Sequence, residues 1–277
     1  MPALNTISID KLARLVGTPA GPVIVDVRTE EDFAADPRLV PGAIRRSHAD
    51  VANWGSQLEG RSAVVVCHTG SKLSHGVAAW LRHQGVPAES LEGGAVAWAA
   101  AGQAMVREER LPLRNTERRT MWVTRARPKV DRIACPWLIR RFVDPDAIFL
   151  FVTPSEVAGV ADRFGATPFD VEGVFWSHRD ELCTFDVMVE ELGLSGSPAL
   201  GRLALIVRGA DTARPELAPQ AAGLLALSLG LSRIYSDDLE QLEAGMLVYD
   251  ALYRWCRDAV DETHDWVSHT PRSKARS

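Results

Sequence analysis

The sequence lacks the features that mark several large classes of protein. Only 4 of its 277 residues are cysteines, and Cys67, Cys135, Cys183 and Cys256 form no CxxC pair. This spacing argues against a disulfide framework and against a zinc site of neighbouring cysteines, and it favours a reducing compartment. No apolar run approaches the roughly 20 residues that cross a bilayer, and the N-terminus does not resemble a signal peptide. We expect a cytoplasmic protein without a membrane partner.

Positively charged residues are also fewer than negatively charged ones. The 31 lysines and arginines are outnumbered by 36 acidic residues, and the net charge is −5. This balance argues against nucleic acid as a partner, although it is compatible with a local basic pocket. With 46% hydrophobic and 24% charged residues, the composition is that of a folded globular protein. The length favours two domains.

The first part of the chain alternates short strands and helices. Buried strands are predicted at residues 22–28, 63–66 and 86–91, where β-branched or apolar residues run together. Helices are predicted at residues 11–16, 74–85 and 95–101. Strands that alternate with helices of this length predict an α/β fold with a mainly parallel sheet flanked by helices over residues 1–106.

A charged segment without apolar period, residues 107–119, is the predicted linker. Beyond it, strands are predicted at 122–124 and 148–152, and helices at 136–143, 184–193, 219–229 and 236–258. This pattern predicts a second, mixed α+β domain rich in helix over residues 120–266. Residues 267–277 are basic and are predicted to form a flexible tail.

One cysteine is placed where a buried strand meets a loop of small residues ahead of a helix. The loop reads Cys67, His68, Thr69, Gly70, Ser71 and Lys72. Consecutive N–H groups in such a loop can form an anion-binding nest, and the following helix adds its positive end. Such a cradle would stabilise a nucleophilic Cys67 thiolate, with Gly70 permitting the turn and Lys72 adding a cation at the rim. A buried structural cysteine is the alternative.

Several short motifs follow one another along residues 4–105. They are Asp26-Val27-Arg28 with Glu31 and Phe33, Pro41-Gly42-Ala43-Ile44, Cys67-x-x-Gly70, and Leu91-Glu92-Gly93-Gly94 with Trp98. In this order they resemble a rhodanese-like sulfurtransferase domain. The resemblance implies that Cys67 takes a sulfane sulfur from a small donor such as thiosulfate, holds it as a persulfide and passes it to a thiol acceptor. It implies that Asp26 and Arg28 support the region of the Cys67 loop, and that no cofactor is required.

The loop departs from that family in two ways. Lys72-Leu73-Ser74 is present where the family often has Arg followed by Ser, and Lys is the weaker bidentate clamp for an oxyanion. One extra residue in the loop resembles the phosphatase and arsenate-reductase branch, whose cradle holds a tetrahedral oxyanion. A thiol-dependent oxyanion reductase therefore stays open, with Cys67 attacking the anion and Cys135 or Cys183 resolving the adduct.

Cations gather in residues 125–142 around Cys135-Pro136, which is the predicted helix start. Arg125, Lys129 and Arg132 form a candidate anion pocket, because side-chain charge and free N–H groups would share one neighbourhood. An exposed basic face paired with acidic residues is the alternative.

A second group of polar residues follows in the same half. His178, Cys183 and Asp186 offer nitrogen, sulfur and oxygen ligands, which a borderline metal ion accepts. The spacing matches no zinc pattern, so helix caps and surface charges are the alternative, with Thr184 as the expected N-cap. Asp250 is a further possible ligand, or else a buried hydrogen-bonded carboxylate.

The second half also carries motifs of a known family. They are Trp122-Val123-Thr124-Arg125, Lys129-x-Asp131-Arg132, Cys135 to Phe142, Cys183-Thr184-Phe185 and Tyr249 to Tyr253. They resemble the C-terminal domain of ChrB-type chromate-resistance proteins. The resemblance implies a link to chromate or a related oxyanion. The leading hypothesis is a sulfurtransferase acting in oxyanion stress, and the alternative is a chromate- or metal-responsive regulator with the rhodanese-like part as scaffold.

Overall fold

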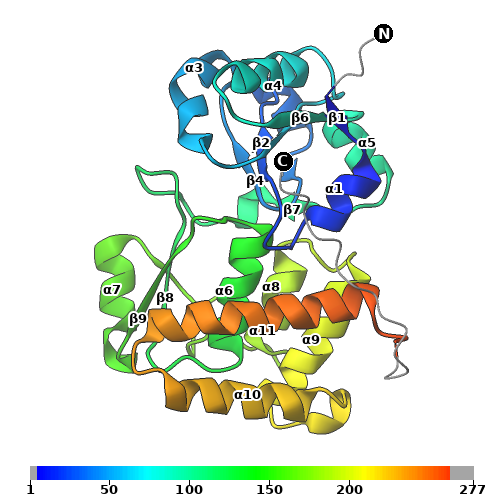
Figure 1. Cartoon of the computed structure of the whole chain (residues 1–277). Helices are drawn as coiled ribbons and strands as arrows, with labels where there is room; N and C mark the ends of the chain where they lie inside the picture. The colour runs from blue at the N-terminus through cyan, green and yellow to red at the C-terminus, as the bar shows by residue number, and fades with distance from the viewer. Residues whose placement is uncertain (1–4, 263–277) are drawn as a thin grey trace.

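The computed structural model describes residues 5–262, which contain two parallel sheets with helices around them (Figure 1). The first sheet has five strands in the order β1-β6-β5-β2-β4, all parallel. The strands are β1 (Thr6–Ile7), β2 (Val23–Asp26), β4 (Ala43–Arg45), β5 (Ala63–Val66) and β6 (Ala88–Leu91). The helices are α1 (Ile9–Leu15), α2 (Glu30–Ala35), α3 (Val51–Trp54), α4 (Leu73–His83) and α5 (Gly94–Ala100). The predicted parallel α/β fold of this part is confirmed.

Both faces of this sheet are buried, which explains why its central strands are apolar throughout. Val65 and Cys67 pack on one side with α3 and α4. Val64 and Val66 pack on the other side with α1 and α5. Because side chains alternate along a strand, one apolar run packs against helices on both faces of the sheet. Cys67 therefore faces the side covered by α3 and α4.

The second sheet has three parallel strands in the order β10-β8-β9 and is accompanied by longer helices. The strands are β8 (Met121–Arg125), β9 (Ile148–Val152) and β10 (Thr167–Pro168). The helices are α6 (Asp131–Phe142), α7 (Val157–Phe164), α8 (Thr184–Glu191), α9 (Pro198–Asp211), α10 (Ala221–Ile234) and α11 (Asp238–Asp258). Short 3-10 helices cover His48–Asp50, Gly55–Leu58, Glu108–Arg110, Pro154–Glu156 and Pro215–Leu217. The helix-rich mixed fold predicted here is also confirmed.

The two parts share one hydrophobic core. The cluster that contains Val64 and Trp98 continues without interruption into Trp122 and Phe142. The predicted linker lies along this junction: β7 (Val106–Arg107) pairs with β3 (Arg38–Leu39) in a two-stranded antiparallel sheet. Its backbone also reaches the second part, since the Arg107 amide donates to the Leu192 carbonyl at 3.0 Å. The segment therefore joins the two parts by packing against both.

One helix boundary differs from the sequence prediction. Helix α6 begins at Asp131, five residues before Pro136, which lies inside the helix. Proline removes one backbone hydrogen bond there, but Ile133 and Trp137 on either side of it are both buried. Burial of these apolar side chains offsets the missing bond. The predicted basic tail, residues 267–277, lies outside the described residues.

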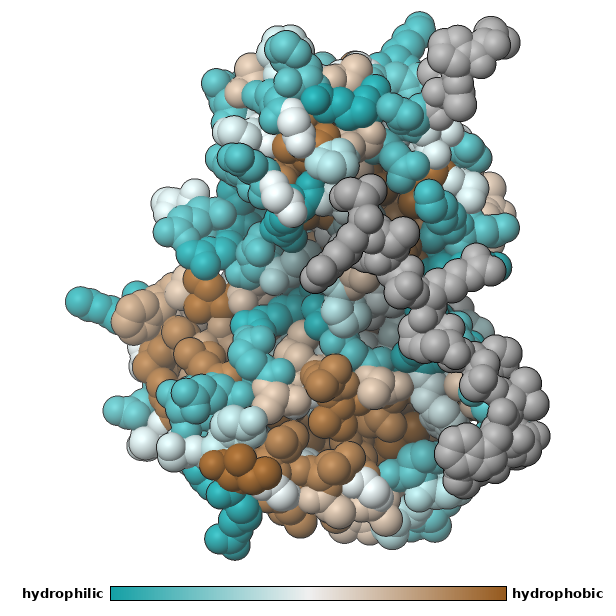
Figure 2. All heavy atoms as spheres, viewed as in Figure 1, coloured by the Kyte–Doolittle hydropathy of each residue, from teal (hydrophilic) through white to brown (hydrophobic). Residues whose placement is uncertain are grey.

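The outer surface includes an apolar region on two helices of the second part. Figure 2 shows apolar side chains gathered over α10 and α11, where Leu227, Ile234 and Leu247 are more than half exposed. Between residues 5 and 262, no helix is both long enough and apolar enough to cross a membrane.

Candidate functional site

Cys67 directly follows the central strand β5, at its carboxyl end. Its side chain is nearly buried, with 3% of the residue exposed, and it packs among the apolar residues under α4. Sγ lies 3.1 Å from both the Ser71 carbonyl oxygen and Ser74 Oγ, which places the thiol proton toward these acceptors. No main-chain amide of the described residues donates to Sγ, so the sulfur is held here by a carbonyl and a hydroxyl and not by the predicted ring of N–H groups.

The loop that follows nevertheless keeps its amides free. Within the described residues, the N–H groups of His68, Thr69, Gly70, Ser71 and Lys72 have no hydrogen-bond acceptor. The loop hydroxyls bond each other, with 3.1 Å between Thr69 Oγ1 and Ser71 Oγ. Lys72 is exposed, has a φ of 37° and precedes α4. Five consecutive unpaired donors are available to an anion or to water.

Two glycines set the shape of this loop. Gly70 and Gly94 both have positive φ, +68° and +62°. A Cβ on Gly94 would lie 2.3 Å from the Cys67 carbonyl oxygen and 2.6 Å from that of His68. These carbonyls accept hydrogen bonds from the first turn of α5, from Ala95 N at 2.9 Å and Val96 N at 3.1 Å. The Gly93-Gly94 turn therefore binds the Cys67 loop directly to α5.

Asp26 and Arg28 form a buried ion pair, with both side chains 1% exposed. Asp26 Oδ2 accepts from Arg28 Nε at 2.8 Å and from NH2 at 2.6 Å. Arg28 also donates to the carbonyls of Asp36 and Arg38. The pair thus supports the segment after β2. Among the described contacts, none joins it to the Cys67 loop.

A second group of polar side chains meets in the second part. His178 Nε2 lies 3.5 Å from Asp131 Oδ2, 3.4 Å from Asp170 Oδ1 and 3.2 Å from Asp211 Oδ2. Asp131 starts α6, Asp170 follows β10, His178 precedes α8, and Asp211 ends α9. We call these four residues the acidic cluster. Among the described residues, Asp131, Asp170 and His178 form the group whose ligand atoms lie within 4.8 Å of one another, as a metal ion requires.

Burial and mutual repulsion control the ionisation of this cluster. Burial raises the pKa of Asp131 well above its usual range, and the neighbouring carboxylates of Asp211 and Asp170 raise it further. Hydrogen bonds to Asp170 and Asp211 raise the pKa of His178 to about 10. Burial acts to raise the pKa of Asp170, but hydrogen bonds from His178 and Thr184 and the charge of Arg132 outweigh it, so this pKa is lowered. Protonated His178 contacts all three carboxylates, whereas the ion pairs of Arg125 and Arg132 within the cluster involve Asp170.

Cys183 and Asp186, which the sequence suggested as ligands beside His178, do not belong to this cluster. Cys183 is the N-cap of α8, and Asp186 accepts from its backbone N–H at 3.1 Å in a capping box. Asp186 also pairs with Arg208 at 3.5 Å. The predicted cap, Thr184, instead donates its hydroxyl to Asp170 Oδ1 at 2.9 Å. Helix capping therefore accounts for the positions of both residues, and among the described residues the structure does not bring them together with His178 as one ligand set.

The carboxylates that do surround His178 were missed. Asp131 and Asp170 lie in stretches with no metal-ligand spacing, and Asp211 is far along the chain on a helix that the periodicity did not reveal. The only available signal was Asp131 in the Lys129-x-Asp131-Arg132 motif.

Two of the three predicted anion-pocket cations border the acidic cluster. Arg125 and Arg132 approach Asp170 Oδ2 at 3.3 and 3.2 Å. Lys129 is exposed, and within the described residues its side chain has no partner. Asp170 therefore neutralises part of the positive charge of Arg125 and Arg132. Asp250, the other possible ligand, is hydrogen-bonded to Trp137 and Arg141, as expected for a structural carboxylate.

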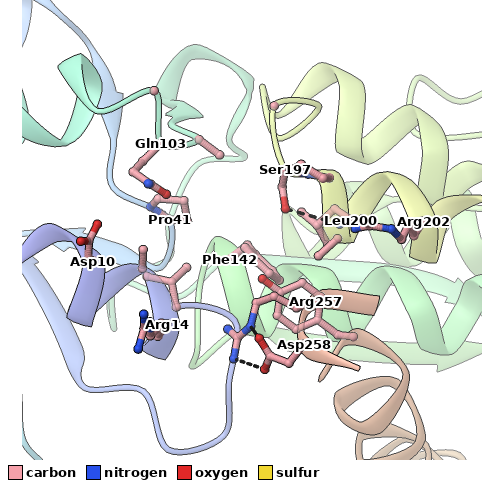
Figure 3. A pocket seen from close by; sticks show the side chains of 18 of the residues that line it. Asp10, Arg14, Pro41, Gln103, Phe142, Ser197, Leu200, Arg202, Arg257 and Asp258 are labelled. Atoms are coloured by element: carbon pink, nitrogen blue, oxygen red, sulfur yellow. Dashed lines mark hydrogen bonds and ion pairs between the residues drawn. The ribbon is translucent and has the colours of Figure 1, made fainter. Parts of the chain in front are cut away.

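A cavity of about 580 Å³ lies between the two parts and contains none of the predicted site residues (Figure 3). Asp10 and Arg14 of α1 line it on one side, and Arg202, Arg257 and Asp258 on the other. Arg257 and Asp258 are paired at 3.1 Å, which balances their charges.

Comparison with known families agrees with this division of the chain. Residues 8–101 match the rhodanese-like domain, and residues 122–256 match the C-terminal domain of ChrB. The chain therefore carries a rhodanese-like domain followed by a ChrB C-terminal domain. It is 36% identical over 133 residues to Protein ChrB of Cupriavidus metallidurans, a match that covers 48% of this chain and 39% of that protein. The chain thus matches less than half the length of this curated relative.

Solved structures similar to this chain include rhodanese-like proteins. A rhodanese-related protein from Thermoplasma volcanium is 20% identical with a TM-score of 0.33, covering 38% of this chain and 99% of that one. Thiosulfate sulfurtransferase from Pseudomonas aeruginosa is 26% identical with a TM-score of 0.33, covering 40% of this chain and 21% of that one.

Proposed function

We propose that this protein is a sulfane-sulfur transferase that carries sulfur on Cys67 and acts in resistance to chromate or a related oxyanion. The observation that supports it most is the position of Cys67, at the end of the central strand and beside five loop amides without an acceptor. The free amides of this loop can bind an anion beside the Cys67 sulfur. The ChrB C-terminal domain supports the link to chromate. The wide cysteine spacing supports a reaction in a reducing compartment such as the cytoplasm.

The reaction has two balanced steps. The Cys67 thiol first gives its proton to water, and Ser74 Oγ, 3.1 Å away, can then donate to the thiolate. The thiolate attacks the outer sulfur of thiosulfate, the S–S bond of thiosulfate breaks, and sulfite leaves with the electron pair. A thiol or cyanide acceptor next attacks the terminal sulfur of the persulfide, which regenerates the thiolate. The free amides of residues 68–72 bind the anionic donor and its leaving group.

The oxyanion-reductase alternative lacks a suitable second thiol. Cys135 and Cys183 are fully buried, and burial raises the pKa of both well above the usual range. They also belong to the core cluster on the opposite side of the first sheet from Cys67. These observations favour sulfur transfer over a reductase that uses either cysteine.

The test is cyanide-dependent release of thiocyanate from thiosulfate. The wild-type protein should release thiocyanate and gain the mass of one sulfur atom after incubation with thiosulfate alone. Cys67→Ala should abolish both, whereas Cys256→Ala, which changes another buried cysteine in α11, should keep both. A wild-type protein without activity or mass gain would overturn the proposal. Tight chromate or metal binding in that inactive protein would instead support the regulator, a candidate favoured by the acidic cluster.

A further inference from the structure

We propose that the acidic cluster is a binding site for one divalent transition-metal ion, held by Asp131, Asp170 and His178, with Asp211 in contact with His178 beside them. This inference concerns the second domain and is independent of the chemistry at Cys67. The donor set of two carboxylates and one imidazole suits Mn²⁺ or Zn²⁺.

The distances between the donor atoms fit coordination of a metal ion better than hydrogen bonds from a protonated His178. Three carboxylate oxygens lie 3.2 to 3.5 Å from one nitrogen, His178 Nε2. A single N–H can direct a linear hydrogen bond to only one of them. Donor atoms bonded tetrahedrally to one ion at about 2.1 Å lie about 3.4 Å apart. The distances from His178 Nε2 to Asp131 Oδ2 and Asp170 Oδ1, 3.5 and 3.4 Å, therefore match donor atoms that share one ion.

An unpartnered buried oxygen provides an independent sign of a missing ligand. Asp131 is fully buried, and its Oδ1 has no hydrogen-bond partner in the described structure. The other oxygen, Oδ2, accepts from the Thr184 amide at 2.6 Å and the Phe185 amide at 3.3 Å, so the carboxylate is firmly oriented. A buried carboxylate oxygen without a partner is costly unless a cation binds it.

The surrounding contacts orient the ligands as metal sites require. Thr184 Oγ1 donates to Asp170 Oδ1, while Arg125 and Arg132 hold Oδ2 of the same carboxylate. The His178 side chain is 41% exposed and that of Asp211 is 20% exposed. The cluster thus has a buried, preorganised side and a side that solvent and an entering ion can reach.

The experiment is a titration of the full-length, chelator-treated protein with Mn²⁺, followed by loss of the free-ion EPR signal, and with Zn²⁺ by calorimetry. We expect one ion per chain. His178→Ala and Asp211→Asn should each weaken binding more than about tenfold. Asp186→Asn is the matched control, because Asp186 is a nearby, largely buried helix aspartate outside the cluster.

Two outcomes would overturn the proposal. The first is the absence of stoichiometric binding of either metal by the wild-type protein. The second is wild-type affinity in both His178→Ala and Asp211→Asn. Because these side chains are partly exposed, folding of the variants does not depend on them as it does on Asp131, and circular dichroism checks it. Cys67→Ala should bind the metal like the wild type, which separates this result from the test of sulfur transfer.

Discussion

Single residues decide the geometry of the Cys67 loop more than its polar side chains do. The loop backbone approaches the Gly93-Gly94 turn so closely that a Cβ on Gly70 would lie 2.5 Å from Gly93 N. No shift of a flexible side chain could relieve such a contact, because the opposing atoms are backbone. The glycines are therefore as important to the candidate site as the cysteine.

Gly94→Ala should destabilise the protein by at least about 2 kcal/mol, because the new Cβ meets backbone oxygens and φ is positive. It should also abolish thiocyanate release. Gly76→Ala in α4 is the control, since nothing lies within 4 Å of its Cβ, and it should stabilise the helix by up to about 1 kcal/mol. Urea unfolding measures both. Equal midpoints for Gly94→Ala and the wild type would contradict this account of the loop.

Among the elements, α6 and α11 form the frame of the second domain. Two consecutive arginines of α6 reach acidic residues of α11 in different surroundings. Arg141 binds Asp250 through two hydrogen bonds of 2.8 Å, and Trp137 Nε1 donates to the same carboxylate. Arg140 binds Glu243 at 2.5 Å. The carboxylate side chains are 9% and 65% exposed, respectively, so the two bridges should differ in strength.

Asp250→Ala should cost about 3 kcal/mol, because it leaves a largely buried guanidinium and an indole N–H without an acceptor. Glu243→Ala removes the same type of bridge between the same helices in solvent, and it should cost less than about 1 kcal/mol. Thermal unfolding, monitored by circular dichroism, distinguishes the two variants. Similar shifts in Tm would show that burial does not determine the strength of these bridges.

At the scale of the whole molecule, the two domains are packed as one body. Phe142, at the end of α6, lies at their junction: its carbonyl accepts from Gly42 N at 2.6 Å. Its ring packs so close to Gly17 that a Cβ there would lie 2.4 Å away. It also contacts Trp137 and Tyr253 of its own domain. We therefore expect both domains to unfold in a single transition.

Phe142→Ala should destabilise the protein by about 3–5 kcal/mol and loosen both domains. Hydrogen exchange should accelerate in β2 and β5 of the first domain as well as in α6. Phe164→Ala, at an exposed position that ends α7, should stay within about 0.5 kcal/mol of the wild type. Faster exchange confined to the second domain would mean that the junction does not couple the two folds.

The longer strands and their parallel arrangement could be predicted from the chain because each depends on residues that are neighbours in sequence, whereas the short edge strands β1, β4 and β10 were missed. β9 was predicted at residues 148–152, where the structure has it, and β5 at 63–66. The start of α6 could not be predicted, because burial of Ile133 and the contact of Asp131 with α8 outweigh the usual place of proline. The loop containing Cys67 was predicted by position, but the direction of its N–H groups was not.

The sequence by itself therefore determined the two folds, since periodicity and β-branched runs set local structure through nearby side chains. It also predicted Cys67 as the candidate nucleophile, through its loop and through the resemblance of several motifs to the rhodanese-like family. Only the tertiary structure decided the acidic cluster, because Asp131, Asp170, His178 and Asp211 come from four separate places in the chain. Their donor atoms meet only when the helices pack, and no local pattern records a convergence produced by packing.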